Sequence, residues 1–161
     1  MNGTNGTSGG TGSDFLARKS DLTRMRQRIP GLKDVLIIDD NNFDADSLRA
    51  TLNMMFGYGL TLRRAKTLGS ALDCVIERRP DLVFLDDILP PSDTALTTIP
   101  FLRRCGYDAG IVVVSGEMTR VRKQELIGAG ASDVIHKDDL DSVRISEALS
   151  RVYKMDIDTQ T

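Results

Sequence analysis

Three short apolar runs constrain the fold of this chain more than any other feature. They occupy residues 35–39, 81–87 and 111–115. Apolar runs of this length are typical of strands that are buried on both faces of a parallel sheet. Longer segments with apolar residues at helical spacing lie between them. This alternation predicts an α/β domain, in which a parallel sheet is covered by helices on both faces.

Two further strands and five helices complete the predicted pattern. A strand near the sheet edge is expected at 60–65, where polar and apolar residues alternate, and the last strand at 132–137. Helices are expected at residues 43–56, 67–80, 99–105, 119–130 and 140–155. The side chains expected to face inward include Phe43, Ile76 and Val143. Pro100 is expected in the first turn of the third helix.

Composition limits the classes of protein to which the chain can belong. Its 161 residues suit one compact domain, and a net charge of -2 gives no overall reason to expect nucleic-acid binding. It has no apolar run of about 18 residues or more and no evident secretory signal, so no membrane contact is expected. Cys74 and Cys105 lack metal-ligand spacing. These features favour a cytoplasmic protein without a disulfide framework.

The ends of the chain differ in character from the domain, which is expected to span residues 30–155. Residues 1–13 are rich in Gly, Thr, Asn and Ser and are expected to form a flexible tail, with a second tail at 156–161. Residues 14–29 place apolar side chains on one face of a helix that carries net positive charge. We favour an extra N-terminal helix packed on its own domain. A docking helix, or one that forms a homodimer, is the alternative.

Polar residues gather where the predicted strands end. They are Asp39 and Asp40 after the first strand, Asp86 and Asp87 after the third, Ser115 after the fourth and Lys137 after the fifth. In a doubly wound sheet of strand order 2-1-3-4-5, the first and third strands are neighbours, and ligands bind beyond their carboxyl ends. We therefore expect Asp39, Asp40 and Asp86 to lie within a few ångströms of one another. Asp87 is interpreted as a loop acid or a charge that faces a helix.

The clustered acids point to a particular chemistry. Neighbouring carboxylates repel one another unless a cation joins them. Oxygen ligands with open positions suit Mg²⁺, a hard octahedral ion that keeps some of its waters. A carboxylate beside Mg²⁺ can attack phosphorus and form an aspartyl phosphate. The Lys137 ammonium and the Ser115 hydroxyl would help to neutralise and bind the phosphoryl oxygens.

These residues, in this order, resemble the response-regulator receiver family over about residues 32–154. The motifs that carry the resemblance are VLIIDDN at 35–41, DLVFLDDILP at 81–90, VVVSGE at 112–117 and Lys137 after AGASDVIH. The resemblance implies a flavodoxin-like arrangement of the sheet. Because only about six residues follow the last helix, we expect a stand-alone receiver that signals through contact with another protein.

The resemblance also implies a role for each residue of the cluster. Asp86 would accept a phosphoryl group from a histidine kinase or a histidine phosphotransfer protein, as part of a two-component phosphorelay. The implied ligands of Mg²⁺ are Asp39, Asp40, Asp86 and the backbone carbonyl of Ile88. Ser115 and Lys137 would bind the phosphoryl group, and Ser115 would shift to reach it. Val134 stands at the secondary switch position, where the family often has an aromatic residue.

One departure from the family pattern supports a second hypothesis. Asp138 follows Lys137, where the family usually has a cis proline, so the peptide bond there is either trans or a strained cis bond. Asp138 or Asp139 is also a candidate N-cap of the last helix. The alternative is therefore a phosphorylation-independent pseudo-receiver, whose acids persist but whose Lys137 loop cannot switch. A Mg²⁺-dependent phosphatase is disfavoured, because residues 39–41 lack the DxD spacing of those enzymes.

Overall fold

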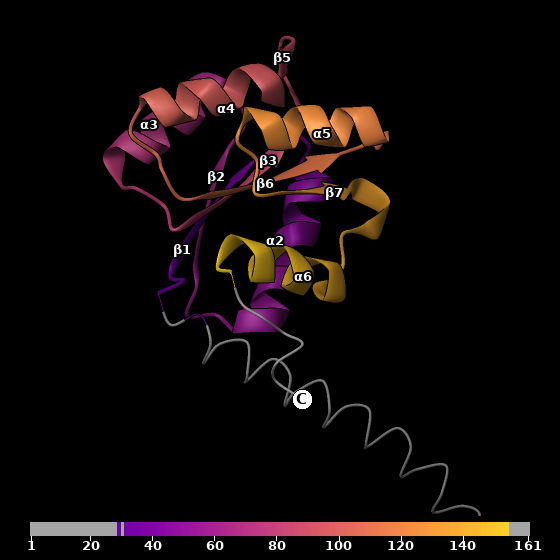
Figure 1. Cartoon of the computed structure of the whole chain (residues 1–161). Helices are drawn as coiled ribbons and strands as arrows, with labels where there is room; N and C mark the ends of the chain where they lie inside the picture. The colour runs from indigo at the N-terminus through magenta and orange to yellow at the C-terminus, as the bar shows by residue number, and fades with distance from the viewer. Residues whose placement is uncertain (1–28, 30, 155–161) are drawn as a thin grey trace, which may run out of the picture. The chain divides into compact units, whose positions relative to one another are not determined.

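The structure, a computed structural model, describes residue 29 and residues 31–154, and it follows the predicted alternation of strands and helices (Figure 1). The expected tails and most of the helix expected at 14–29 lie outside the described residues. The parallel strands are β1 (Asp34–Ile38), β2 (Thr61–Ala65), β3 (Leu82–Asp86), β6 (Gly110–Ser115) and β7 (Asp133–His136). Their order is β2-β1-β3-β6-β7, which confirms the predicted doubly wound sheet of order 2-1-3-4-5.

The helices lie in two layers on this sheet. They are α2 (Asn42–Phe56), α3 (Leu68–Glu77), α4 (Ala95–Arg104), α5 (Arg120–Ala129) and α6 (Ser142–Val152). Helices α3, α4 and α5 cover one face, and α2 and α6 cover the other (Figure 1). Strand side chains alternate between the two faces. In β1, Leu36 and Ile38 join the core cluster that includes residues of α3, α4 and α5, while Val35 and Ile37 are also fully buried.

Polar N-cap side chains mark the start of two helices next to the carboxyl edge of the sheet. The Asn41 side chain accepts a hydrogen bond from the Asp44 N–H (3.0 Å), so α2 begins directly after the first acidic pair. Thr119 caps α5 by accepting from the Arg122 N–H (3.1 Å). These caps fix where the first turns of α2 and α5 stand relative to the strand ends.

Two predicted helix starts are wrong. Helix α4 begins at Ala95, not at residue 99, and Pro100 lies inside it. The early start follows from a hydrogen bond of 2.7 Å that the Ala95 N–H donates to the Asp87 carbonyl. Pro100 lacks the N–H that would bond one turn back, and the helix tolerates this loss. At the C-terminal end, Asp141 caps α6 in place of Asp138 or Asp139, which lie in the 3₁₀ turn η1 (Lys137–Asp139).

Three side chains expected to face inward are exposed: Phe43, Ile76 and Val143. In α3 the buried face is set by Ala71 and Val75. Ile76 lies one residue further, about 100° around the helix, and so points away from the core. The predicted spacing was therefore helical, but the assigned face was wrong for these residues.

Among the described residues, no helix is both long and apolar enough to cross a bilayer. A small antiparallel pair, β4 (Ile88–Leu89) and β5 (Asp93–Thr94), follows the end of β3. This pair was not predicted from the sequence.

Candidate functional site

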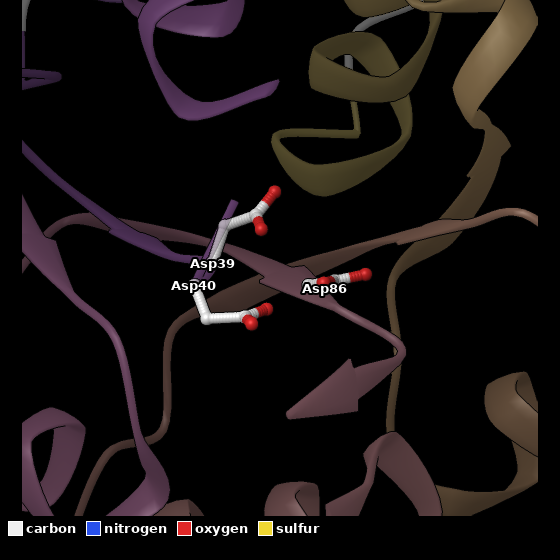
Figure 2. Close-up of side chains that lie close together, drawn as sticks. All are labelled: Asp39, Asp40 and Asp86. Carbon is white, nitrogen blue, oxygen red and sulfur yellow. The ribbon is translucent and has the colours of Figure 1, made fainter. Parts of the chain in front are cut away.

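Three carboxylates meet at the carboxyl edge of the sheet, as predicted. Strands β1 and β3 pair in parallel with Ile38 opposite Leu85, so Asp39 and Asp86 are the next residues along two neighbouring strands. One carboxylate oxygen from each of Asp39, Asp40 and Asp86 lies within 4.8 Å of the others (Figure 2). Asp39 and Asp86 are buried and Asp40 is exposed, so the group opens to solvent on one side.

The surroundings disfavour the charge on the two buried acids. Burial, and then the neighbouring charge of Asp39, raise the pKa of Asp86 to about 6, although the Lys137 ammonium opposes the rise. Burial also raises the pKa of Asp39, against the hydrogen bond of 2.9 Å that its carboxylate accepts from the Asn41 N–H. A positive charge between these groups would remove most of this penalty.

The donor atoms at this edge fit a hard divalent cation. All three side-chain donors are carboxylate oxygens, which Mg²⁺ and Ca²⁺ prefer. Asp40 and Asp86 also line an open cavity of about 560 Å³, together with Ile88, Ser115 and Lys137. This cavity leaves space for coordinated waters and for a phosphoryl group. Three of the four predicted ligand residues, Asp40, Asp86 and Ile88, therefore line one cavity.

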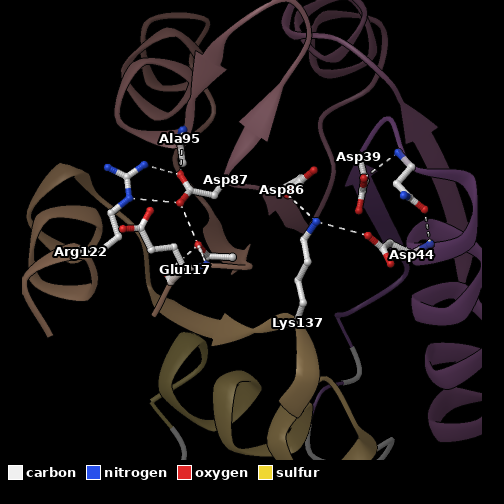
Figure 3. A network of polar contacts seen from close by, with 10 residues as sticks. Asp39, Asp44, Asp86, Asp87, Ala95, Glu117, Arg122 and Lys137 are labelled. Atoms are coloured by element: carbon white, nitrogen blue, oxygen red, sulfur yellow. Dashed lines mark hydrogen bonds and ion pairs between the residues drawn. The ribbon is translucent and has the colours of Figure 1, made fainter. Parts of the chain in front are cut away.

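Lys137 reaches the site from the end of β7. Its Nζ lies 3.4 Å from Asp86 Oδ1 and 3.3 Å from Asp44 Oδ2 (Figure 3). Burial alone would lower the pKa of Lys137, but the carboxylates of Asp86, Asp44 and Asp39 outweigh it and raise the pKa. Lys137 is thus a cation held next to the acid expected to react. Asp44 was not predicted from the sequence, and the first turn of α2 directs its side chain toward Lys137.

The side chain of Ser115 contacts Asp87 at the end of β3. It is 1% exposed, and its hydroxyl is within hydrogen-bond distance of Asp87 Oδ2 (2.9 Å). Asp87 is also buried, and Arg122 from α5 donates to both of its carboxylate oxygens (Figure 3). Of the two interpretations of Asp87, the structure favours the charge that faces a helix. No pattern in the sequence indicated Arg122, because nothing in its spacing pairs it with Asp87.

The remaining predicted residues lie on β7 and its following turn. Val134 is fully buried in the cluster under α4 and α5 and pairs in register with Val113. The peptide bond between Lys137 and Asp138 is trans. The Asp138 N–H donates to His136 Nδ1 (3.1 Å), which closes the turn after β7.

A sequence model of the response regulator receiver domain matches residues 35–150. The chain belongs to this family. Among curated receivers, the response regulator MprA of Mycobacterium sp. strain KMS is 33% identical over 103 residues, which is 64% of this chain and 43% of that protein. MprA of Mycobacterium avium strain 104 is 31% identical over the same length. This receiver chain therefore spans less than half the length of the curated relatives that it matches.

Solved receiver structures share its fold. The Francisella response regulator 1452 receiver domain aligns with a TM-score of 0.65 at 18% identity, covering 77% of this chain and 99% of that one. A response regulator from Burkholderia pseudomallei, solved with a phosphorylated aspartic acid, calcium ion and citrate, aligns with a TM-score of 0.62 at 25% identity. That alignment covers 74% of this chain and 66% of the other.

Proposed function

We propose that this receiver accepts a phosphoryl group on Asp86 from a phosphohistidine of a histidine kinase or phosphotransfer protein, in a Mg²⁺-dependent reaction. The observation that carries the proposal is the position of Asp86, which lies buried beside two further carboxylates and 3.4 Å from the Lys137 ammonium. A carboxylate in this position can act as a nucleophile, and the neighbouring ammonium can neutralise the oxygens of the incoming phosphoryl group.

The chain's own residues account for most of the transfer. A carboxylate oxygen of Asp86 attacks phosphorus, the N–P bond to the donor imidazole breaks, and the departing nitrogen takes up a proton. Asp39, Asp40, Asp86 and the Ile88 carbonyl would hold Mg²⁺, which neutralises phosphoryl oxygens when bound. Lys137 would pair with another phosphoryl oxygen, and Ser115 would donate a hydrogen bond to a third.

Two further observations support this assignment. Because the pKa of Asp86 is about 6, the carboxylate is ionised and nucleophilic at neutral pH. The related Burkholderia pseudomallei protein was solved with a phosphorylated aspartic acid and a calcium ion, a divalent cation with the same preference for oxygen ligands as Mg²⁺. We propose that output passes through contact with a downstream protein and not through direct binding of this domain to nucleic acid. A homodimer through residues 14–29 also stays a prediction.

Mass spectrometry tests the proposal. Incubation with Mg²⁺ and a small-molecule phosphodonor is expected to add about 80 Da, the mass of one phosphoryl group, to the intact protein. The adduct should be lost in Asp86→Asn and should require Mg²⁺. Asp46→Asn, which removes an exposed acid of α2, is the matched control and should still be labelled.

The pseudo-receiver is the second candidate. Its support is the Lys137 contact with Asp44, which offers the ammonium an alternative to a phosphoryl group, and the acid that follows Lys137. Absence of any adduct from a folded, Mg²⁺-loaded protein would favour this alternative over the acceptor.

A further inference from the structure

Asp87 lies next to the proposed acceptor, but its side chain belongs to a separate network. Asp86 turns toward Lys137, whereas Asp87 turns to the opposite side, toward α5 (Figure 3). The residue is 3% exposed, and its carboxylate accepts hydrogen bonds from Arg122 Nη2 (2.6 Å) and Nε (3.1 Å). The Ala95 N–H lies 3.4 Å from the same carboxylate. A buried acid with this many partners has a fixed orientation.

The register of the sheet explains why the Ser115 hydroxyl forms its hydrogen bond with Asp87 and not with Asp86. Strand β3 pairs with β6 so that Asp86 lies opposite Val114. The Asp87 N–H donates to the Val114 carbonyl (3.0 Å), which keeps the next two residues, Asp87 and Ser115, level with each other. The hydroxyl of Ser115 therefore meets the carboxylate of Asp87 at 2.9 Å.

The Ser115 hydroxyl carries one hydrogen and has two acceptors within reach. These are Asp87 Oδ2 (2.9 Å) and the carbonyl of Glu117 (2.8 Å), while the Glu117 N–H donates to Ser115 Oγ (3.1 Å). A hydrogen bond to a charged carboxylate is stronger than one to a neutral carbonyl. The hydroxyl cannot donate to Asp87 and to a phosphoryl group on Asp86 at the same time.

We propose that Asp87, which Arg122 holds in place, is a positioning residue that keeps the Ser115 hydroxyl hydrogen-bonded to its own carboxylate in the unphosphorylated protein. This hydrogen bond lowers the affinity of the site for a phosphoryl group on Asp86. The inference rests on the proposed function of Asp86 and Ser115. Because Arg122 is in the first turn of α5, release of Ser115 also removes a hydrogen bond from the carboxylate that this helix end contacts. The hydrogen bond with Asp87 raises the pKa of Arg122, which keeps this partner charged.

Binding of beryllium fluoride, a tetrahedral mimic of a phosphoryl group, tests the inference in the presence of Mg²⁺. Four proteins are compared: the natural chain, Asp87→Asn, Ser115→Ala and the double variant. Asparagine keeps the size of Asp87 but replaces a charged acceptor with a neutral one. We expect Asp87→Asn to tighten beryllium fluoride binding about fivefold, and to have no effect when Ser115 is already alanine.

Three results would overturn the inference: no change in Asp87→Asn, weaker binding, or an equal change in both Ser115 backgrounds. The last result would indicate a purely structural role. If the natural chain itself fails to bind the mimic, the proposed function fails first. If Asp87→Asn loses its fold by circular dichroism, Asp87→Leu with Arg122→Met removes both charges together and carries the same expectations.

Nuclear magnetic resonance can report on the environment of the Arg122 side chain directly. Its Nε–H donates to Asp87 Oδ2, the same oxygen that Ser115 contacts. The nuclear magnetic resonance signal of this guanidinium Nε–H should therefore shift when beryllium fluoride draws Ser115 away. The shift should be absent in Ser115→Ala. A shift of equal size in Ser115→Ala would contradict the proposed link between the two side chains.

Discussion

Asp86 is ionised at neutral pH at a cost to the folded protein. Burial and the Asp39 charge raise its pKa to about 6, and Lys137 offsets only part of this effect. The folded protein therefore binds a proton on Asp86 more tightly than the unfolded chain does, whose pKa is near 3.8. The stabilising contribution of this proton is complete below pH 3.8 and is lost as the pH rises through about 6.

This cost predicts that Asp86→Asn stabilises the protein without Mg²⁺ at pH 8. The expected gain in the free energy of unfolding is about 1–3 kcal/mol, since asparagine is neutral at every pH. The gain should shrink as the pH falls through 6 and be small near pH 4. Urea unfolding at both pH values measures it, with Asp46→Asn as the control for loss of an exposed acid. An Asp86→Asn variant less stable than the natural chain at pH 8 would contradict this electrostatic account.

The acids at the strand ends and Lys137 could be predicted from the sequence, whereas Asp44 and Arg122 could not. Asp39, Asp40 and Asp86 stand at strand ends, and parallel pairing brings strand ends together whatever the loops do. Asp44 and Arg122 lie in the first turns of helices, where the caps at Asn41 and Thr119 decide which side chain points to the site. This orientation depends on tertiary packing and leaves no periodic signal in the sequence.

At the scale of elements, two glycines lie at the C-terminal end of helix α5. Gly130 follows the helix with φ of 119°, a left-handed conformation, and an added Cβ would lie 3.3 Å from Ile99 Cγ2. Gly128 lies inside the helix, and an added Cβ would meet nothing within 4 Å. The two glycines, two residues apart, thus serve different purposes.

Alanine substitutions should separate these two glycines. Gly130→Ala is expected to destabilise the protein by about 1–3 kcal/mol, because alanine is strained at this φ and crowds Ile99. Gly128→Ala is expected to stabilise it by about 0.5–1 kcal/mol, because alanine favours the helix. Thermal unfolding of both variants is the measurement. Equal effects of the two substitutions would show that the helix does not end as described.

A buried ion pair joins β7 to α6. Burial would raise the pKa of Asp133, but hydrogen bonds from Arg144 and the charges of Arg144 and Arg151 outweigh it and lower the pKa. Arg144 donates to both Asp133 oxygens and to the Val134 carbonyl, and its side chain is 18% exposed. Arg151 makes one bond to Asp133 and is 54% exposed.

The two arginines should therefore differ in their contribution to stability. Arg144→Met is expected to cost about 2–4 kcal/mol, because it leaves a buried carboxylate with one exposed partner. Arg151→Met is expected to cost about 1 kcal/mol or less. Chemical denaturation at pH 7 compares the two variants. The larger loss should diminish below pH 4, as Asp133 becomes protonated, and a larger loss in Arg151→Met would contradict the assignment.

Secondary structure was predictable where burial set the pattern. The runs at 35–39, 81–87 and 111–115 correspond to β1, β3 and β6, because strands covered on both faces have no polar side. The start of α4 was missed because it depends on a backbone contact with Asp87 across a loop. The hairpin of β4 and β5 has two residues per strand, which is too short to show alternation.

For the whole molecule, we expect the proposed metal site to couple metal binding to folding. The carboxylates that would hold Mg²⁺ repel one another in the folded chain and are far apart in the unfolded one, so a cation stabilises the folded state alone. The strand order that brings them together could be predicted, since right-handed crossovers leave few alternatives for five parallel strands.

Mg²⁺ is therefore expected to raise the free energy of unfolding at pH 8. At a concentration of about 100 times its dissociation constant the gain should be roughly 2.7 kcal/mol. The gain should fall at pH 5, where Asp86 is mostly protonated. Asp40→Asn should lose most of it while folding normally, because Asp40 is exposed. An undiminished effect of Mg²⁺ in Asp40→Asn would place the ion elsewhere.

Reduction with borohydride tests whether Asp86 itself carries the phosphoryl group. Borohydride reduces an acyl phosphate of aspartate to homoserine, so the modified position can be read by sequencing peptides of the phosphodonor-treated protein. We predict homoserine at position 86 in the presence of Mg²⁺ and at no other acid of the cluster. Homoserine at Asp87 or Asp39, or its absence from every position, would contradict the account.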